Sequence, residues 1–354
     1  MLLTQTDLDD NKLILNLSLA RMTFLTLEEK KKFANNIDNY SKLALLSIED
    51  IEKETGRAFK RKTGWNGAEN LRCAQNAARR CMAMKIAIVA YDDPEYPEIL
   101  RQISDPPFLL FCRGNVGLLK ERSVSVVGTR TASAAGTKAA TSFGYDACMD
   151  GVCVVSGLAN GIDGYAHRGA INAYFDAQEK GMELSKLGRT IAVLPSAIDE
   201  IVPGGHKKMA EQILQTGGCL ISEYEPGMGI ANWHFVGRNR IIAGLSPATV
   251  VIEAPAGSGA LITADFASDY NRDVLFHEAA FGEMAEKIAA VVAGDLEKRF
   301  STGEVSKYKL ENRPEKFIKN GAPVIKDYKD YCKAMTEMPG LRSAKIIQQK
   351  LFED

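Results

Sequence analysis

Small and hydroxyl-bearing residues follow several apolar runs of the sequence, at the points where each run ends. Residues 124–127 lead into Gly128-Thr129-Arg130, and residues 152–155 lead into a glycine-rich turn over 156–161. Apolar, β-branched runs of this length are typical of buried parallel strands, and such turns bring backbone amides and helix N-termini to one edge of a sheet. That edge suits an anion, above all phosphate. The turn positions predicted to form this site are Gly128, Thr129, Arg130, Ser133, Gly136, Ser156, Gly157, Gly161, Gly257, Ser258 and Gly259.

Basic side chains stand close to these turns in the sequence. Arg130 directly follows the first strand, where a guanidinium can clamp a phosphate or stack on a base. A surface arginine is usually only solvated, but an Arg-Asn-Arg triplet directly before an apolar segment is less often so. The basic and amide residues predicted to join the site are Lys207, Lys208, Arg238, Asn239 and Arg240.

No residue pattern indicates catalysis. The G-x-G-x-x-G fingerprint and the Walker A lysine are absent, which disfavours a simple dinucleotide or nucleoside triphosphate site. Asp163 and His167 lie four residues apart on a predicted helix, and we interpret them as a helix-start cap and a hydrogen-bonded histidine rather than a general-base pair. Glu223 and Glu253 each close a strand, where they suit acid–base chemistry or structural hydrogen bonds, and we favour the latter. The sequence therefore predicts no catalytic residue, no metal site and no cofactor.

Strand-like and helical segments alternate through the middle of the chain. Strands are predicted over 124–127, 152–155, 190–194, 219–222, 249–252 and 274–276, and helices over 134–149, 162–180, 207–216 and 261–271. This alternation predicts right-handed βαβ units and an α/β fold, an extended Rossmann-like parallel sheet with helices on both faces. In such a sheet ligands bind outside the carboxyl ends of the strands, where the turns listed above would meet.

The pattern changes on both sides of this region. Residues 1–84 are predicted to form a small helical domain of SAM or helix-hairpin type, with helix N-caps at Thr26 and Ser47. Residues 85–330 form the main domain and include a strand over 108–112 before the alternation begins. After a helix over 284–292, residues 294–314 are charged and aperiodic, and a last strand is expected over 322–325. Residues 331–354 form a short C-terminal tail.

Composition and charge exclude several classes of protein. The 354 residues are 45% hydrophobic and 25% charged, as in ordinary soluble domains. A net charge of −1 argues against a generally basic nucleic-acid binder, although the distribution of charge matters more than its sum. No apolar run approaches the ~20 residues that cross a bilayer, and no secretory signal opens the chain, so we expect a cytoplasmic protein without membrane contact. The scattered cysteines and histidines lack the spacing of a disulfide framework or a zinc site.

Several motifs follow one another in a specific order between about residues 85 and 280. They are Ser125-Val-Val-Gly-Thr-Arg130, Val154-Val-Ser-Gly-Leu-Ala-Asn-Gly-Ile-Asp163, Ile221-Ser-Glu-Tyr224, Arg238-Asn-Arg-Ile-Ile-Ala-Gly-Leu-Ser246 and Ser258-Gly-Ala-Leu-Ile-Thr263. Together they closely resemble the DprA/Smf family, the DNA-processing proteins of natural transformation.

The resemblance implies a non-catalytic protein that binds single-stranded DNA, forms a homodimer and loads RecA recombinase onto DNA covered by single-strand-binding protein. It places the DNA pocket at Gly128-Thr129-Arg130, so Arg130 carries over most directly and Lys207 and Lys208 more loosely. The chain departs from the family at Val202-Pro-Gly-Gly-His206 and at Phe235-Val236, where the family has Tyr-Pro-x-x-Asn and Phe-Pro. Some members end in a winged helix, for which the residues after 330 are too few.

Two other classes of function remain open. A nucleotide-binding enzyme or sensor of the related lysine-decarboxylase-like or phosphoribohydrolase class would bind a mononucleotide tightly and depend on Glu223 or Glu253. A scaffold for protein partners would bind neither DNA nor nucleotides. Binding of a single-stranded oligonucleotide that weakens with salt distinguishes the first interpretation from both.

Overall fold

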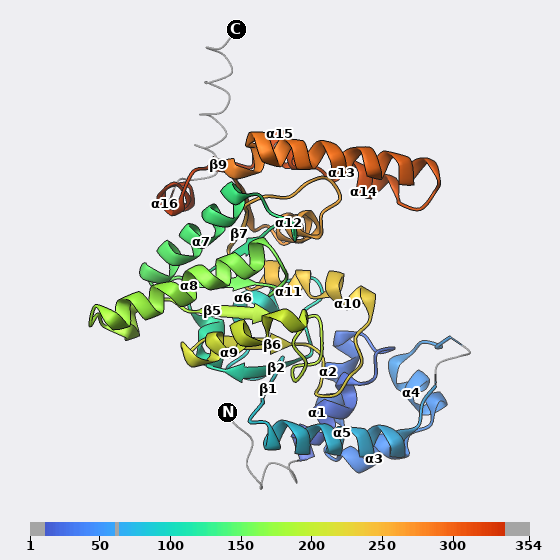
Figure 1. Ribbon diagram of the computed structural model, residues 1–354. Helices are drawn as coiled ribbons and strands as arrows, with labels where there is room; N and C mark the ends of the chain where they lie inside the picture. Colours follow the sequence, from blue (N-terminus) through green and yellow to red (C-terminus); the bar gives the residue numbers. More distant parts are fainter. Residues whose placement is uncertain (1–10, 61–63, 337–354) are drawn as a thin grey trace.

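A single mixed sheet forms the centre of the protein. The structure is a computed structural model and describes residues 11–60 and 64–336. Its strands are β1 (Ala87–Ala90), β2 (Leu109–Gly114), β3 (Ser123–Val127), β4 (Cys153–Ser156), β5 (Thr190–Val193), β6 (Cys219–Ser222), β7 (Ala248–Val251), β8 (Asp273–His277) and β9 (Val324–Ile325). They lie in the order β1-β2-β6-β5-β4-β3-β7-β8-β9 (Figure 1).

The sheet is parallel from β6 to β9 and antiparallel at one edge. Strand β2 pairs antiparallel with both β1 and β6, whereas the remaining neighbours pair in parallel. The predicted Rossmann-like α/β fold is confirmed, with its βαβ alternation. The antiparallel edge differs from the prediction. Strand β1 was not predicted, because the segment before β3 is short and does not show the alternation of strands and helices.

Helices cover both faces of the sheet, as predicted. Two consecutive residues of β3 point to opposite faces: Val126 packs in one apolar cluster with Phe143 of α7, and Val127 packs in another with Ile242 of α11. One face carries α7 (Ala134–Met149), α8 (Ile162–Glu179), α9 (Lys207–Gln215) and α16 (Tyr328–Thr336). The other carries α6 (Glu98–Arg101), α11 (Asn239–Gly244) and α12 (Gly259–Asp269), and α10 (Asn232–Gly237) leads into α11.

The N-terminal region is helical. It contains α1 (Asn11–Ala20), α2 (Leu27–Asn36), α3 (Tyr40–Leu45), α4 (Ile48–Thr55) and α5 (Gly67–Ala83). Thr26 and Ser47 cap α2 and α4 through capping boxes, which confirms both predicted N-caps. This region contacts the loop after β6, because Arg21 pairs with Glu225 and Arg80 donates to the Pro226 carbonyl at 3.2 Å. The boundary after residue 84 stays a prediction.

The segment after β8 is more regular than predicted. Helix α13 (Glu283–Ser301) extends beyond the helix predicted over 284–292 and is followed by α14 (Lys307–Glu311) and α15 (Pro314–Lys319), so the charged, aperiodic residues 294–314 are largely helical. Within 294–311 only Leu296 is buried, so this stretch of the sequence shows little apolar period. In Figure 1 these helices form a lobe beside α12 at one end of the sheet.

The last described helix runs through the predicted start of the tail. Tyr328 and Tyr331 of α16 lie edge-on to Phe143 at ring-centroid distances of 5.5 and 5.6 Å. The helix therefore belongs to the packed core of the main domain. The rest of the predicted tail, 337–354, lies outside the described residues. No helix within the described part of the chain is long and apolar enough to cross a bilayer.

Candidate functional site

The strand order creates a crevice at the carboxyl ends of β3 and β7. The chain runs outward from β3 through β4 and β5 to β6, and then returns to place β7 on the other side of β3. The loops that leave β3 and β7 therefore diverge to opposite faces of the sheet, which is the point where ligands bind in open α/β folds. A cavity of about 410 Å³ lies there.

The cavity brings together half of the predicted site residues. Those that line it are Gly128, Thr129, Arg130, Arg238, Asn239, Gly257, Ser258 and Gly259. Phe235 and Val236 of α10 line it as well, and they form one of the two places where the sequence departs from the family it resembles. The predicted residues that do not line it are Ser133, Gly136, Ser156, Gly157, Gly161, Lys207, Lys208 and Arg240.

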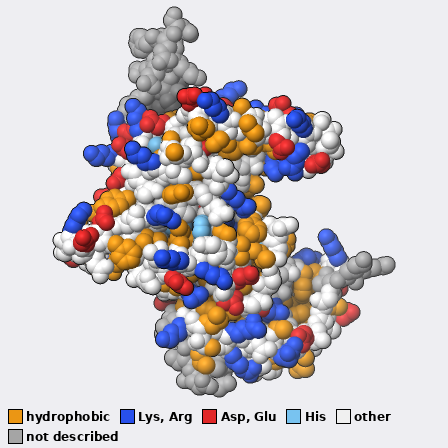
Figure 2. Space-filling model, viewed as in Figure 1, with side chains coloured by type: hydrophobic (Ala, Val, Ile, Leu, Met, Phe, Trp, Pro, Cys, Tyr) orange, Lys and Arg blue, Asp and Glu red, His pale blue; other side chains and the backbone are white. Residues whose placement is uncertain are grey.

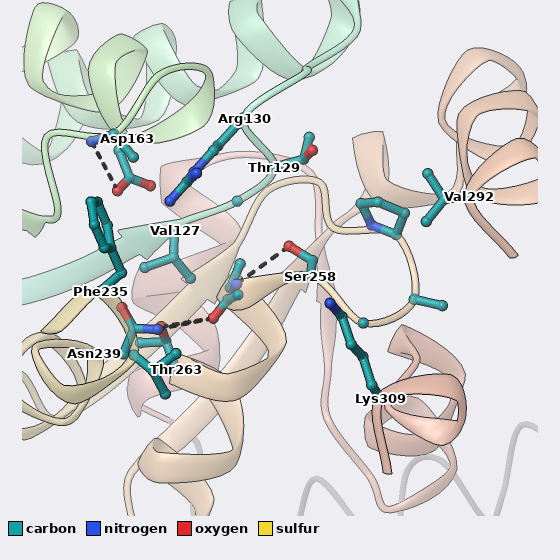
Figure 3. Close-up of a pocket in the computed structure, with 18 of the residues that line it drawn as sticks. Val127, Thr129, Arg130, Asp163, Phe235, Asn239, Ser258, Thr263, Val292 and Lys309 are labelled. Atoms are coloured by element: carbon teal, nitrogen blue, oxygen red, sulfur yellow. Dashed lines mark hydrogen bonds between the residues drawn. The ribbon is translucent and has the colours of Figure 1, made fainter. Parts of the chain in front are cut away.

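Arg130 is the exposed cation of the β3 turn. Its guanidinium lies 5.5 Å from the centroid of the Phe235 ring, and both side chains face the cavity (Figure 3). Within the described part of the chain Arg130 makes no ion pair. A guanidinium beside an aromatic face offers a charge for a phosphate and a plane for a base.

The turn that carries Arg130 is held by a close contact with Gly161. Gly161 has φ +76°, and a Cβ there would lie 2.2 Å from the Thr129 carbonyl oxygen and 2.6 Å from that of Arg130. The amide of Ile162 also donates to the Thr129 carbonyl at 3.1 Å. Gly161 thus acts on the site by positioning the Arg130 turn, although it does not line the cavity.

The carboxylate of Glu253 lies at the amino end of α7. The buried carboxylate of Glu253 accepts from the Ser133 amide at 3.1 Å and from the Ser133 hydroxyl at 2.9 Å. Gly136 leaves room for it, since a Cβ there would lie 2.1 Å from its Oε2 atom. Glu253 therefore has the structural role that we favoured, and this helix end is not free for a phosphate.

The polar groups of the turn after β4 are also hydrogen-bonded within the chain. The amides of Gly157 and Ala159 donate to the Asp163 carboxylate at 3.1 and 3.4 Å, and the Ser156 hydroxyl donates to the Val126 carbonyl at 2.6 Å. Burial raises the pKa of Asp163, and the guanidinium of Arg238, 3.9 Å away, opposes that shift. The expectation that backbone amides of these turns bind a phosphate is corrected for Ser133 and Gly157, because internal carboxylates accept hydrogen bonds from their amides.

Arg238 and Arg240 are both buried and bonded within the chain. Arg238 donates to the carbonyls of Gly157 and Val193, and burial lowers its pKa to about 10. Arg240 pairs with Glu223 at 2.7 Å and with Asp105 at 3.1 Å. Both side chains therefore hold neighbouring segments in place; Arg238 also lines the cavity, whereas Arg240 does not.

Lys207 and Lys208 are exposed at the start of α9, apart from the cavity. Just before them, His206 lies 2.9 Å through Nδ1 from the Leu158 carbonyl, so the departing segment 202–206 contacts the β4 turn. Figure 2 shows basic side chains gathered over the face that carries α8 and α9. Their predicted contact with DNA stays a prediction.

His167 is a buried, neutral histidine. Its Nε2 accepts from the Leu158 amide at 3.3 Å, and its Nδ1 lies 2.6 Å from the Thr190 hydroxyl. Because that hydroxyl donates to the Val154 carbonyl at 2.8 Å, it accepts the Nδ1 proton. Both ring nitrogens are thus occupied and no proton can be added without breaking a bond. The interpretation of His167 as a hydrogen-bonded structural residue agrees with this geometry.

We expect His167 to make the fold sensitive to acid. Burial lowers its pKa from 6.5 to about 3, so between these values the unfolded chain binds a proton that the folded chain does not. This contribution to stability is present above pH 6.5 and is lost as the pH falls, by about 1.4 kcal/mol per pH unit. Urea unfolding at pH 6.5 and pH 5 should therefore show a loss of about 2 kcal/mol that a His167→Gln variant lacks. Equal pH dependence in the two proteins would contradict this assignment.

Sequence reasoning missed one wall of the cavity. Val292, Asp295, Leu296 and Arg299 of α13 and Lys309 of α14 line it, opposite the β3 turn. The charged composition of this segment was visible in the sequence, but nothing local indicated that it folds back onto the loop after β7. Figure 2 shows the surface hollowed between this lobe and the face below it.

Comparisons with known proteins agree with this fold and site. The family model described as DNA recombination-mediator protein A matches residues 87–336. Protein Smf of Borreliella burgdorferi is 34% identical over 273 residues, which cover 77% of this chain and 82% of that protein. DNA processing protein DprA of Bacillus subtilis is 36% identical over 190 residues, which cover 53% of this chain and 59% of that protein.

Two solved structures share the architecture. DprA of Streptococcus pneumoniae is 27% identical with a TM-score of 0.62, covering 94% of this chain and 98% of its own. DprA of Helicobacter pylori, a structure described for its single-stranded DNA binding mode, is 21% identical with a TM-score of 0.52, covering 71% and 95%. The second likeness shows the fold alone. With the family match over most of the main domain, the chain belongs to the DNA recombination-mediator protein A family, that of the DprA and Smf proteins.

Proposed function

We propose that this protein binds single-stranded DNA without catalysis and helps to load RecA recombinase onto it. The observation that carries the proposal is that the exposed Arg130 lies beside Phe235 in the cavity at the carboxyl ends of β3 and β7. Binding of a single strand needs cations for the backbone and aromatic faces for unstacked bases, and this pair supplies both. Trp233, 65% exposed on the same helix as Phe235, offers a further stacking face.

The near-zero net charge is consistent with this role. Because a single strand is bound by a few positioned cations, a local cluster is sufficient and an overall basic protein is not required. Homodimerisation, which we also propose, would join two such sites and raise the affinity by avidity. We further propose that the protein acts in the cytoplasm, in DNA processing during transformation, with RecA and single-strand-binding protein as its partners.

The enzymatic alternative has less support. It requires Glu223 or Glu253 to be available for acid–base chemistry. Glu253 is 2% exposed and bonded to Ser133, and Glu223 is paired with Arg240. Both carboxylates therefore serve the fold, and no observation favours turnover of a mononucleotide.

We expect the wild-type protein to bind fluorescent oligo-dT more tightly than a matched duplex, with an affinity that falls as salt rises. The Arg130→Ala variant should bind oligo-dT about tenfold more weakly, because a charge and a stacking plane are lost together. Fluorescence anisotropy across a salt series measures both effects.

Arg122 supplies the matched control. It is an exposed arginine just before β3, at the opposite edge of the sheet from Arg130. Arg122→Ala should bind like the wild type. Equal affinities of the two variants would contradict the proposed pocket. RecA filament formation on DNA covered by single-strand-binding protein, measured with and without this protein, tests the loading role, and an unchanged rate would exclude it.

A further inference from the structure

The helices α13 to α15, residues 283–319, form an arm that is fixed to α12. The Asp265 carboxylate of α12 accepts from the Tyr308 hydroxyl at 2.6 Å, the Asn312 amide at 2.7 Å and the Lys316 ammonium at 2.9 Å. Leu296 of the arm is 4% exposed. Several bonds to one carboxylate and a buried apolar contact hold the arm in one position against the main domain.

The loop after β7 is shaped to receive this arm. Gly257 has φ +65°, and a Cβ there would lie 2.9 Å from Lys309 Cγ and 3.2 Å from Leu296 Cδ1. Its amide donates to the Asn312 carbonyl at 2.9 Å. Glycine is therefore needed twice at this position, for its backbone conformation and for the close approach of the arm. The arm therefore forms a fixed wall of the cavity.

Four cations and two carboxylates line the cavity: Arg130, Arg238, Arg299, Lys309, Asp163 and Asp295. Arg238 lies beside Asp163 at 3.9 Å, and Arg299 lies 3.8 Å from Asp295 and 3.2 Å from Glu304. Among the described residues, neither Arg130 nor Lys309 has such a partner. Two positive charges that form no ion pair with a described residue thus face the cavity, one from each wall.

The two charges approach the cavity from different sides. Arg130 points in from the β3 turn toward Asp163 and Phe235, whereas Lys309 extends from α14 along the loop toward Ser258 (Figure 3). An ammonium is a compact charge that suits a phosphate oxygen, and a guanidinium can also stack on a base. A cavity of about 410 Å³ is within the range of small-ligand sites.

We propose that Lys309 is a second phosphate-binding residue and that the arm makes this site a two-walled clamp for one nucleotide unit of a single strand. Arg130 and Phe235 contact the base or its phosphate on one side, and Lys309 binds the adjoining phosphodiester on the other. This inference rests on the proposed function, because it names a further contact of the same DNA site.

The test compares Lys309→Ala with Lys307→Ala in oligo-dT binding over a salt series. Lys307 lies on the same short helix, is exposed and pairs with Glu311 at 3.4 Å, so its loss changes the net charge equally. We expect Lys309→Ala to weaken binding about threefold to tenfold at low salt and to reduce the slope of log affinity against log salt by about 0.7, the value for one phosphate contact. Lys307→Ala should leave the slope unchanged, and Lys309→Arg should restore it.

The outcomes separate this inference from the proposed function. If Lys309→Ala and Lys307→Ala bind alike while Arg130→Ala is weakened, the clamp is overturned and single-stranded DNA binding stands. If the wild type does not bind oligo-dT, the proposed function fails and the clamp fails with it. A thermal melt of each variant shows that the fold is intact, and Tyr308→Phe, which removes one bond between arm and α12, should weaken binding less than Lys309→Ala.

Discussion

Arg238→Ala is expected to lower the free energy of unfolding by about 3 to 5 kcal/mol, the cost of removing one partner of a buried ion pair. The side chain is 5% exposed and donates to the carbonyls of Gly157 and Val193. Without it, those carbonyls lose a donor and Asp163 keeps a buried charge without its cation. Urea unfolding followed by circular dichroism measures the loss.

Arg130→Ala is the control for this prediction, because Arg130 is exposed and should leave stability within about 0.5 kcal/mol of the wild type. Comparing the two variants thus distinguishes a buried, structural arginine from an exposed one, although the sequence predicted both in the same site. Adding Asp163→Asn to Arg238→Ala should recover part of the stability, since it removes the charge left behind. An Arg238→Ala protein as stable as wild type would show that the guanidinium does not support the two turns.

The sheet and its helices were predictable because their signals are local. Helix α7 covers 134–149 as expected, and β3 to β8 lie close to the predicted ranges. Each strand is an apolar run bounded by small residues, and each helix has the length that a crossover connection requires. The same logic placed the crevice, since the carboxyl ends of parallel strands lie at one edge.

The pairing of polar groups was not predictable in the same way. The Ser133 amide bonds to Glu253, which lies 120 residues later, and Arg240 bonds to Asp105, 135 residues earlier. No local pattern reports such contacts. A glycine-rich turn whose amides are free and one whose amides bind an internal carboxylate therefore look alike in the sequence. Only the three-dimensional structure distinguishes Arg130, which is exposed, from Arg238 and Arg240, which are buried and bonded within the chain.

The arm illustrates a second limit. Of its residues 294–311 only Leu296 is buried, so this stretch lacks the apolar period that identifies α9. What fixes the arm is the Asp265 carboxylate, which comes from α12, more than forty residues earlier. A segment held by long-range polar contacts appears aperiodic and charged, which is how residues 294–314 were described from the sequence.

Gly161→Ala is expected to destabilise the protein by about 3 kcal/mol and to weaken oligo-dT binding at the same time. The backbone there, at φ +76° and ψ −133°, costs a residue with a side chain about 1 to 3 kcal/mol. The added Cβ also lies 2.2 Å from the Thr129 carbonyl, so the turn that carries Arg130 must move. Gly181→Ala is the matched control after the other end of α8: its φ is +65°, but no atom lies within 4 Å of the new Cβ, so only a strain of about 1 to 2 kcal/mol is expected, with no loss of binding. Equal losses in the two variants would mean that the contact between Gly161 and the Arg130 turn does not position the site.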